Sequence, residues 1–310
     1  MSTLATPRDA AAPHHSFGLV ELGLYGLTIF AWSTSWIALK WQVGVVAPEV
    51  SVAYRFLLAA AVMFAWLTAT GQRLRFPASV HLRFALQGAL IFSTNFYLFY
   101  RGGAYLASGL LSVVFSLASV GNLLLSALLL GQRIERRVAL GALTGFMGIG
   151  LLFWPEIAGT DFNGRALTGL GFCVAGTLFF CSGSILASAN QRSGLPIFST
   201  TAWGMAYGAV LMLGLSLVND RSFAIDVSAK YIGGMLWLAL VSSVAAFAAY
   251  LTLMSRIGAA RAGYATVIFP IFALAISSVE EGYVWTPLAV AGLIAVVAGN
   301  LIILSRPNKR

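Results

Sequence analysis

Long apolar segments recur along almost the whole chain, and they decide what it can fold into. The sequence is 59% hydrophobic and only 9% charged, whereas soluble proteins average about 45–50% and about 25%. A water-soluble fold is therefore excluded. A helix needs about 20 apolar residues to cross a bilayer, so we predict ten transmembrane helices with short connections, at about residues 18–39, 48–69, 83–100, 104–130, 137–155, 166–188, 195–218, 231–252, 260–279 and 285–305.

The basic residues predict the orientation of these helices. If the first helix starts in the cytoplasm, thirteen Lys and Arg residues lie inside, five lie outside, and Arg55 falls within a span. The inside set is Arg8, Arg73, Arg75, Arg83, Arg133, Arg136, Arg137, Arg192, Arg256, Arg261, Arg306, Lys309 and Arg310, and the outside set is Lys40, Arg101, Arg165, Arg221 and Lys230. Lys and Arg concentrate on the cytoplasmic side, so residues 1–17 and 306–310 are expected to be cytoplasmic tails. The net charge of +9 is thus explained by the excess of Lys and Arg on the cytoplasmic side of the membrane, and no nucleic-acid partner is expected.

A tandem duplication emerges when the two halves are compared at an offset of about 150 residues. Pro48 and Ser51 match Pro196 and Ser199, and the segment 108–116 aligns with 262–270. Gly131, Gly141 and Gly148 repeat with identical spacing as Gly282, Gly292 and Gly299. Each repeat, 18–155 and 166–305, holds five spans, and because five is odd the second copy must be inverted. Inverted repeats are typical of secondary transporters, whose substrate site lies between the repeats.

At these residues the chain resembles the drug/metabolite transporter superfamily, in its branch of ten helices and two five-helix repeats. The resemblance rests on 32–35 (Trp-Ser-Thr-Ser), Pro48 with 54–56 (Tyr-Arg-Phe), 269–270 (Phe-Pro) and 131–133 (Gly-Gln-Arg). The chain looks most like the bacterial aromatic amino-acid exporter group. This implies an all-α polytopic protein of the bacterial inner membrane that exports amino acids and related metabolites. The family usually has Gly-Glu after the fourth helix, where this chain has Gln132, and Glu281 occupies the corresponding place in the second half.

Polar residues within the spans are the first candidates for substrate contact, because a bilayer tolerates them only against a cavity or another helix. Asn95 lies mid-span with four hydrogen-bonding sites and could hold an amino or carboxylate group. The candidate hydroxyls are those of Ser35, Ser112, Ser116, Ser182 and Ser184. Contact between helices is the other interpretation of each serine.

Aromatic residues supply the second set of candidates. Those predicted to wall the site are Trp32, Phe99, Phe247, Tyr250 and Tyr264. Aromatic walls with a few hydroxyls and amides suit a zwitterion that carries an apolar side chain. Core packing or an interfacial belt is the competing interpretation.

Two further residues are candidates for a gating or charge role. Arg55 is the lone deep cation; it could neutralise a substrate carboxylate, or pair with helix-end carbonyls or with Glu280 and Glu281. Pro270 lacks the N–H that a helix interior needs, whereas its counterpart Ser116 has one. The proline therefore predicts either a hinge or a packing kink in the ninth span.

Other classes of protein find little support in the sequence. The three histidines lie at cytoplasmic edges and no Asp falls inside a span, so an intramembrane protease is disfavoured. No phosphate-binding loop and no Cys/His zinc pattern is present, so neither a cofactor nor a metal is expected. We expect a monomer or weak dimer in membrane lipid that moves amino acids by alternating access, facilitated or driven by the substrate gradient. The alternatives are a proton-coupled drug/metabolite exporter and a membrane receptor without transport activity.

Overall fold

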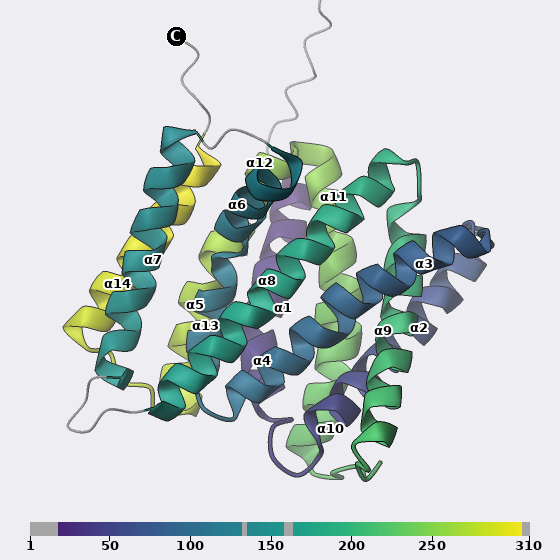
Figure 1. Ribbon diagram of the computed structural model, residues 1–310, viewed down its shortest axis with the longest axis horizontal. Helices are drawn as coiled ribbons and strands as arrows, with labels where there is room; N and C mark the ends of the chain where they lie inside the picture. The colour runs from purple at the N-terminus through teal and green to yellow at the C-terminus, as the bar shows by residue number, and fades with distance from the viewer. Residues whose placement is uncertain (1–17, 132–134, 158–163, 306–310) are drawn as a thin grey trace, which may run out of the picture.

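The computed structural model describes residues 18–131, 135–157 and 164–305, and every element in these ranges is a helix (Figure 1). This confirms the predicted all-α polytopic fold. The predicted tails, 1–17 and 306–310, lie outside the described residues, as does Gln132.

Six predicted spans are single α-helices: α1 (Leu19–Lys40), α2 (Pro48–Ala69), α7 (Arg136–Ile157), α8 (Gly164–Arg192), α9 (Ile197–Val218) and α14 (Pro287–Leu304). The other four are built from consecutive pieces. The third consists of α3 (Ala78–Gln87), the π-helix η1 (Gly88–Thr94) and α4 (Asn95–Gly103), and the fourth of α5 (Ser108–Ser116) and α6 (Ala118–Leu130). The eighth consists of α10 (Ala229–Leu236), the π-helix η2 (Trp237–Ala245) and α11 (Ala246–Ile257), and the ninth of α12 (Ala259–Ala262) and α13 (Ala265–Glu280).

By length and composition, the described residues contain eight helical stretches able to cross a membrane, and α13 is a shorter apolar helix. The third span is less apolar because its first turns carry His81, Arg83 and Gln87. A π-helix lies in both the third and the eighth span, which are counterparts in the two halves. Such widened turns are rare and frequently occur at functional sites.

Local chemistry explains where several helices begin and end. Pro48 and Pro287 occupy the first positions of α2 and α14, where a missing N–H costs nothing. Thr286 accepts a hydrogen bond from the N–H of Ala289 and so caps α14. Gly131 ends α6 with a φ of 65°, a left-handed conformation that glycine adopts without strain.

The spans run between two ends of the bundle, which we name by their chain connections. The terminal face holds the start of α1 and the end of α14, at the top of Figure 1, and the opposite face holds the connection from α1 to α2. An ion pair between Glu21 and Arg256 joins α1 to α11 at the terminal face, at 2.7 Å. Arg221, in the connection after α9, pairs with Glu49 of α2 at 2.8 Å at the opposite face.

Helices pack against their counterparts in the other half of the sequence. The contacting pairs are α2 with α9, α5 with α13 and α7 with α14. Contacts between helices that are not counterparts also come in pairs, one for each half of the chain. The contact of α1 with α11 corresponds to that of α8 with α4, and the contact of α2 with η2 corresponds to that of α9 with η1.

Glycines allow α7 and α14 to touch through their backbones. A Cβ added at Gly148 would lie 2.7 Å from the carbonyl oxygen of Gly292, and one added at Gly299 would lie 2.6 Å from that of Gly141. Neither distance is compatible with a side chain, so this contact requires glycine. The pair α7 and α14 lies at the edge of the bundle, on the left of Figure 1.

Candidate functional site

Seven aromatic side chains from six spans meet in the interior of the bundle. This aromatic cluster consists of Trp32 and Trp36 (α1), Phe99 (α4), Phe115 (α5), Phe180 (α8), Tyr250 (α11) and Phe269 (α13). The ring centroid of Trp36 lies 5.2 Å from that of Phe99 and 5.5 Å from that of Phe115. Rings at such distances attract one another in tilted and edge-to-face geometries. Helices from both halves of the chain therefore converge on one aromatic surface.

The structure brings together three of the aromatic residues predicted from the sequence. Trp32 lies 4.9 Å from Tyr250, centroid to centroid, and Phe99 joins the same cluster through Trp36. Phe247 and Tyr264 lie elsewhere, half-buried, on α11 and at the N-cap of α13.

Phe115 and Phe180 belong to the cluster and were not predicted. Their centroids are 4.8 Å apart and link α5 to α8. The duplication held a signal for Phe115, because the alignment of 108–116 with 262–270 places it opposite Phe269. No comparable signal marked Phe180.

The predicted serines all donate their hydroxyl protons within their own helices. Their acceptors are the carbonyls of Trp32 (from Ser35), Gly109 (from Ser112), Val113 (from Ser116), Leu178 (from Ser182) and Phe180 (from Ser184). Each hydroxyl oxygen keeps lone pairs that can accept a hydrogen bond from another group. Ser112 and Ser116 are buried, whereas Ser35, Ser182 and Ser184 are half-buried.

Asn95 joins two helices through its side chain. Its Nδ2 donates to the carbonyl oxygen of Gly176 at 2.8 Å, so it ties α4 to α8, and its side chain is buried. At least one of its donors is therefore engaged in helix packing.

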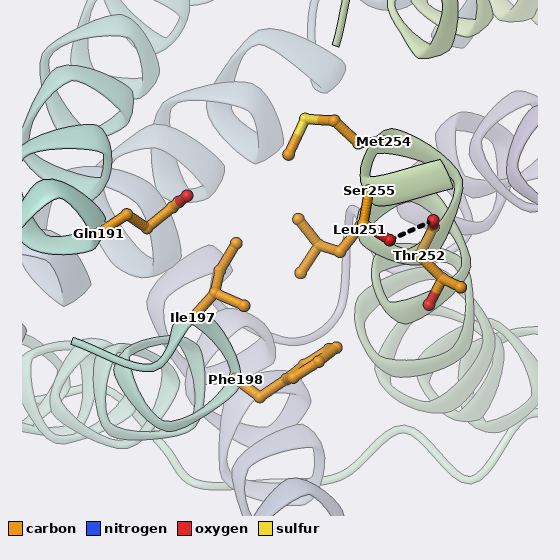
Figure 2. A pocket seen from close by; sticks show the side chains of 7 residues that line it. All are labelled: Gln191, Ile197, Phe198, Leu251, Thr252, Met254 and Ser255. Atoms are coloured by element: carbon orange, nitrogen blue, oxygen red, sulfur yellow. Dashed lines mark hydrogen bonds between the residues drawn. The ribbon is translucent and has the colours of Figure 1, made fainter. Parts of the chain in front are cut away.

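A pocket of about 300 Å³ opens near the terminal face, between the α8–α9 corner and α11. Figure 2 shows the two walls facing each other: Gln191, Ile197 and Phe198 on one side, and Leu251, Thr252, Met254 and Ser255 on the other. The lining is mainly apolar, with a few hydroxyl and amide groups, as is usual for small-molecule sites.

Helical periodicity extends both pocket walls toward the aromatic cluster. Positions three and four residues apart share a helix face. Ser184 and Phe180 therefore continue the face of Gln191 along α8, and Phe247 continues the face of Leu251 along α11. Ser184 thus lies between the pocket and Phe180 of the aromatic cluster on α8, whereas on α11 the cluster residue Tyr250 directly precedes the pocket residue Leu251 and Phe247 lies one turn further from the pocket.

The opposite face is closed by a charged cluster, which we call the Lys40–Glu281 cluster. The Nζ of Lys40 lies 3.8 Å from Oε1 of Glu281 and donates to the carbonyls of Gly103 and Leu106. Oε2 of Glu281 accepts from the N–H of Ser108 at 2.8 Å, from the Ser108 hydroxyl, and from the Ser277 hydroxyl at 2.8 Å. These contacts join α1, α4, α5 and α13 at one point.

Arg55 lies apart from this cluster, so the predicted pairing with Glu280 or Glu281 is wrong. Its guanidinium is buried, and its Nε and Nη2 both donate to the hydroxyl of Ser243 in η2, at 3.1 and 3.0 Å. Its Cζ lies 4.2 Å from the ring centroid of Phe96. The cation thus joins α2 to the third and eighth spans.

Pro270 is buried inside α13, next to the aromatic cluster. The Ser33 hydroxyl lies 2.7 Å from the carbonyl oxygen of Ile29 in its own helix and 3.1 Å from that of Phe269, the residue before the proline. The proline step is therefore bound directly to α1.

Metal ligands do not gather anywhere in the part of the chain that the structure describes. Within 18–131, 135–157 and 164–305, no three His, Cys, Asp or Glu side chains form a group that could hold an ion.

These features define a multi-pass, all-helical membrane protein with an aromatic cluster in its interior, an apolar pocket near the terminal face and a charged cluster at the opposite face. The EamA-like transporter family matches residues 22–154 and again residues 167–305. The chain belongs to this family, and its resemblance to the drug/metabolite transporter superfamily is confirmed. It is therefore a membrane transporter.

Individual relatives agree with this assignment. An "Uncharacterized transporter" of Archaeoglobus fulgidus is 26% identical over 90% of this chain and 97% of its own length. The "Probable amino-acid metabolite efflux pump" of Salmonella typhimurium is 22% identical over 89% of this chain and 92% of its own. A crystal structure of a protein with 19% identity has the same fold, with a TM-score of 0.64 over 91% of this chain and 95% of that one.

Proposed function

We propose that this protein exports amino acids, aromatic and other neutral ones, and related metabolites from the bacterial cytoplasm by alternating access. The observation that carries the proposal is the combination of an open pocket at the terminal face, the aromatic cluster beyond it, and the Lys40–Glu281 cluster at the opposite face. A site accessible from one side and closed at the other is one of the two states that alternating access requires.

The terminal face is assigned to the cytoplasm in this proposal. Arg73, Arg75, Arg192 and Arg256 lie at its helix ends and connections, and Lys and Arg concentrate on the cytoplasmic side of a membrane. The open pocket then receives substrate from the cytoplasm, as an exporter of the inner membrane requires.

Two inverted five-helix repeats, 18–155 and 166–305, account for the arrangement of helices. The family matches the chain twice, once in each half. Counterpart helices pack together, and the contacts between non-counterparts occur in matching pairs. Both properties are expected of repeats related by an axis in the membrane plane.

The closed face has no chemical equivalent at the terminal face. In the repeat alignment, which pairs Gly131 with Gly282, Leu130 takes the place of Glu281, and Ala262 takes the place of Ser108. The counterpart positions therefore lack both the carboxylate and the hydroxyl that join α5 to α13 at the opposite face. This asymmetry favours a resting state that is open to the cytoplasm.

The substrate class follows from the lining of the site. Aromatic rings from both halves offer an apolar wall, and Ser35 and Ser184 add half-buried hydroxyl oxygens. This combination suits a small zwitterion with an apolar side chain. The name of the Salmonella relative, an amino-acid metabolite efflux pump, agrees with it.

Counterflow in proteoliposomes tests the proposal. Vesicles containing only the purified protein are loaded with unlabelled L-phenylalanine and exposed to a trace of labelled L-phenylalanine outside. Transient accumulation of label above that in protein-free vesicles is expected. Equal label in both kinds of vesicle, for phenylalanine, leucine and threonine alike, would refute amino-acid transport.

A further inference from the structure

Arg55 is a cation buried deep within a span. Its side chain is only 3% exposed, and it stands seven positions into α2, about 10 Å along the helix axis at 1.5 Å per residue. A cation at such depth is costly unless an anion or several polar groups compensate it. The groups around Arg55 must therefore supply this compensation.

Neutral groups surround the guanidinium on every side for which the structure gives a contact. Its Nε and Nη2 converge on the hydroxyl of Ser243, and its plane lies over the ring of Phe96 and near that of Phe56, at 4.2 and 5.0 Å from Cζ. The four ion pairs formed among residues 18–131, 135–157 and 164–305 use other cations: Lys40, Arg137, Arg221 and Arg256. Arg55 is thus a buried cation without a carboxylate partner in the described chain.

The edge that Arg55 presents to Ser243 is the edge that usually binds a carboxylate. Nε and one Nη of a guanidinium form a planar fork that matches the two oxygens of a carboxylate. Here a single hydroxyl oxygen receives both donors. That oxygen belongs to η2, a widened helical turn of the kind often found at functional sites.

We propose that Arg55 is the carboxylate-binding residue of the substrate site, and that Ser243 occupies its fork when no substrate is bound. This inference rests on the proposed function and narrows its substrate class to carboxylate-bearing molecules with an apolar body. Phe96 orients the guanidinium from α4, and Phe99, one turn further on the same helix, belongs to the aromatic cluster. A carboxylate on Arg55 therefore places the attached side chain toward that cluster.

The test is a binding measurement that does not depend on transport. The thermal unfolding midpoint of the purified, detergent-solubilised protein is measured with 3-phenylpropanoate and with 3-phenylpropanamide, which differ by one charge. A ligand that binds the folded state raises this midpoint. We expect the amide to bind about 10- to 100-fold more weakly, because it loses a charge-assisted hydrogen bond.

Three variants show whether Arg55 causes the preference for the carboxylate probe over the amide probe. Arg55→Gln should bind the two probes equally weakly, and Arg55→Lys should keep a reduced preference for the carboxylate because it keeps the charge. Arg101→Gln is the matched control: Arg101 also lies against aromatic rings, those of Tyr97 and Phe172, but outside the proposed site. Its preference should equal that of the wild type.

Two outcomes would overturn the inference: a wild-type protein that does not distinguish the two probes, or an Arg55→Gln variant that keeps the full preference. If Arg55→Gln does not fold, the Arg55→Lys variant is the test instead. If it prefers the carboxylate probe as strongly as the wild type does, the planar fork of the guanidinium is not used in binding. Failure of the proposed function is seen separately, as absence of counterflow by the wild type.

Discussion

Glu281 at the end of α13 accepts hydrogen bonds from both the main-chain N–H and the hydroxyl of Ser108 at the start of α5. Counterpart helices of the two halves are thus joined at the opposite face by one carboxylate. The same carboxylate group also approaches the Nζ of Lys40. Separation of α5 from α13 must break both hydrogen bonds between Ser108 and Glu281.

Glu281→Gln should loosen this closure. The substitution removes the charge and weakens the hydrogen bonds to Ser108, a loss of about 1–2 kcal/mol for contacts to a charged group at a partly exposed position. That corresponds to roughly a 5- to 30-fold shift between closed and open populations. A cysteine at Ser112, one turn deeper and fully buried, should react faster by that factor with a membrane-impermeant maleimide added outside.

The background for this experiment replaces the two native cysteines, Cys173 and Cys181, which are buried and free. Glu280→Gln is the matched control, because Glu280 is exposed and adjacent to Glu281. A labelling rate that is unchanged in Glu281→Gln, or equally raised in both variants, would show that the Lys40–Glu281 cluster does not control access.

Helix positions were predictable from the sequence because apolar runs of about 20 residues have few alternatives in a bilayer. The position of the break between the third and fourth spans was harder to predict. It was expected at Arg101, Gly102 and Gly103, but α4 continues through Gly103 and the turn follows at 104–107. Glycine at a helix end is tolerated when it packs closely, and Gly102 lies against Cys173 of α8.

Side-chain partners were much harder to predict. Asn95 was interpreted as a substrate anchor, yet one of its donors is bound to the carbonyl of Gly176, 81 positions away. For Arg55 the sequence left a substrate carboxylate, helix-end carbonyls and the acids Glu280 and Glu281 open as partners, and none of these alternatives includes its contact Ser243, 188 positions away. Periodicity shows which face of a helix a residue occupies but not which distant helix packs there, and only the duplication carried such long-range information.

Trp32→Ala should impair transport without unfolding the protein. Trp32 is half-buried and lies against Tyr250, so its removal opens the wall between α1 and α11. The loss of its aromatic contacts with Tyr250 and Phe269, each worth about 0.5–1.5 kcal/mol, together with lost apolar area, predicts an apparent KM for phenylalanine raised by about tenfold. Counterflow rates over a range of concentrations measure it.

Trp154→Ala is the control for this variant. Trp154 lies on α7 and is 61% exposed, so its loss should leave the KM unchanged. Equal KM values in both variants and the wild type would place the substrate away from the aromatic cluster.

Gly148→Ala should destabilise the contact between α7 and α14. The added Cβ would lie 2.6 Å from the backbone nitrogen of Val296, and overpacking of this kind costs about 1–3 kcal/mol. The measurable result is a lower thermal unfolding midpoint in detergent. Gly150→Ala, two positions along the same helix with nothing within 4 Å of the added atom, should match or exceed the wild type, since alanine is the better helix former. Equal midpoints for the two variants would contradict the close contact.

The topology predicts that single cysteines at Arg75 and Val227 are labelled from opposite sides of the membrane. Both positions are exposed in connections, Arg75 at the terminal face and Val227 at the opposite face. In whole cells a membrane-impermeant maleimide should label only the cysteine at 227, and after permeabilisation it should label both. Labelling of position 75 alone in intact cells would reverse the orientation, and labelling of both would contradict the helix count between them.

The last prediction concerns the driving force. The acids Glu21 and Glu49 lie in the first turns of α1 and α2, where each is engaged by an arginine, and Glu281 lies at the end of α13 with Lys40 nearby. Across the described spans, the middle turns hold no acidic or histidine side chain, although proton-coupled carriers commonly place such a group at depth. We therefore expect facilitated movement of a zwitterion, with export in cells relying on a high cytoplasmic concentration. In proteoliposomes at zero membrane potential, labelled leucine should equilibrate without accumulating, with or without an imposed pH gradient. Accumulation that a protonophore abolishes would contradict this, and its loss in Glu281→Gln but not in Glu280→Gln would identify Glu281 as the proton-coupling group.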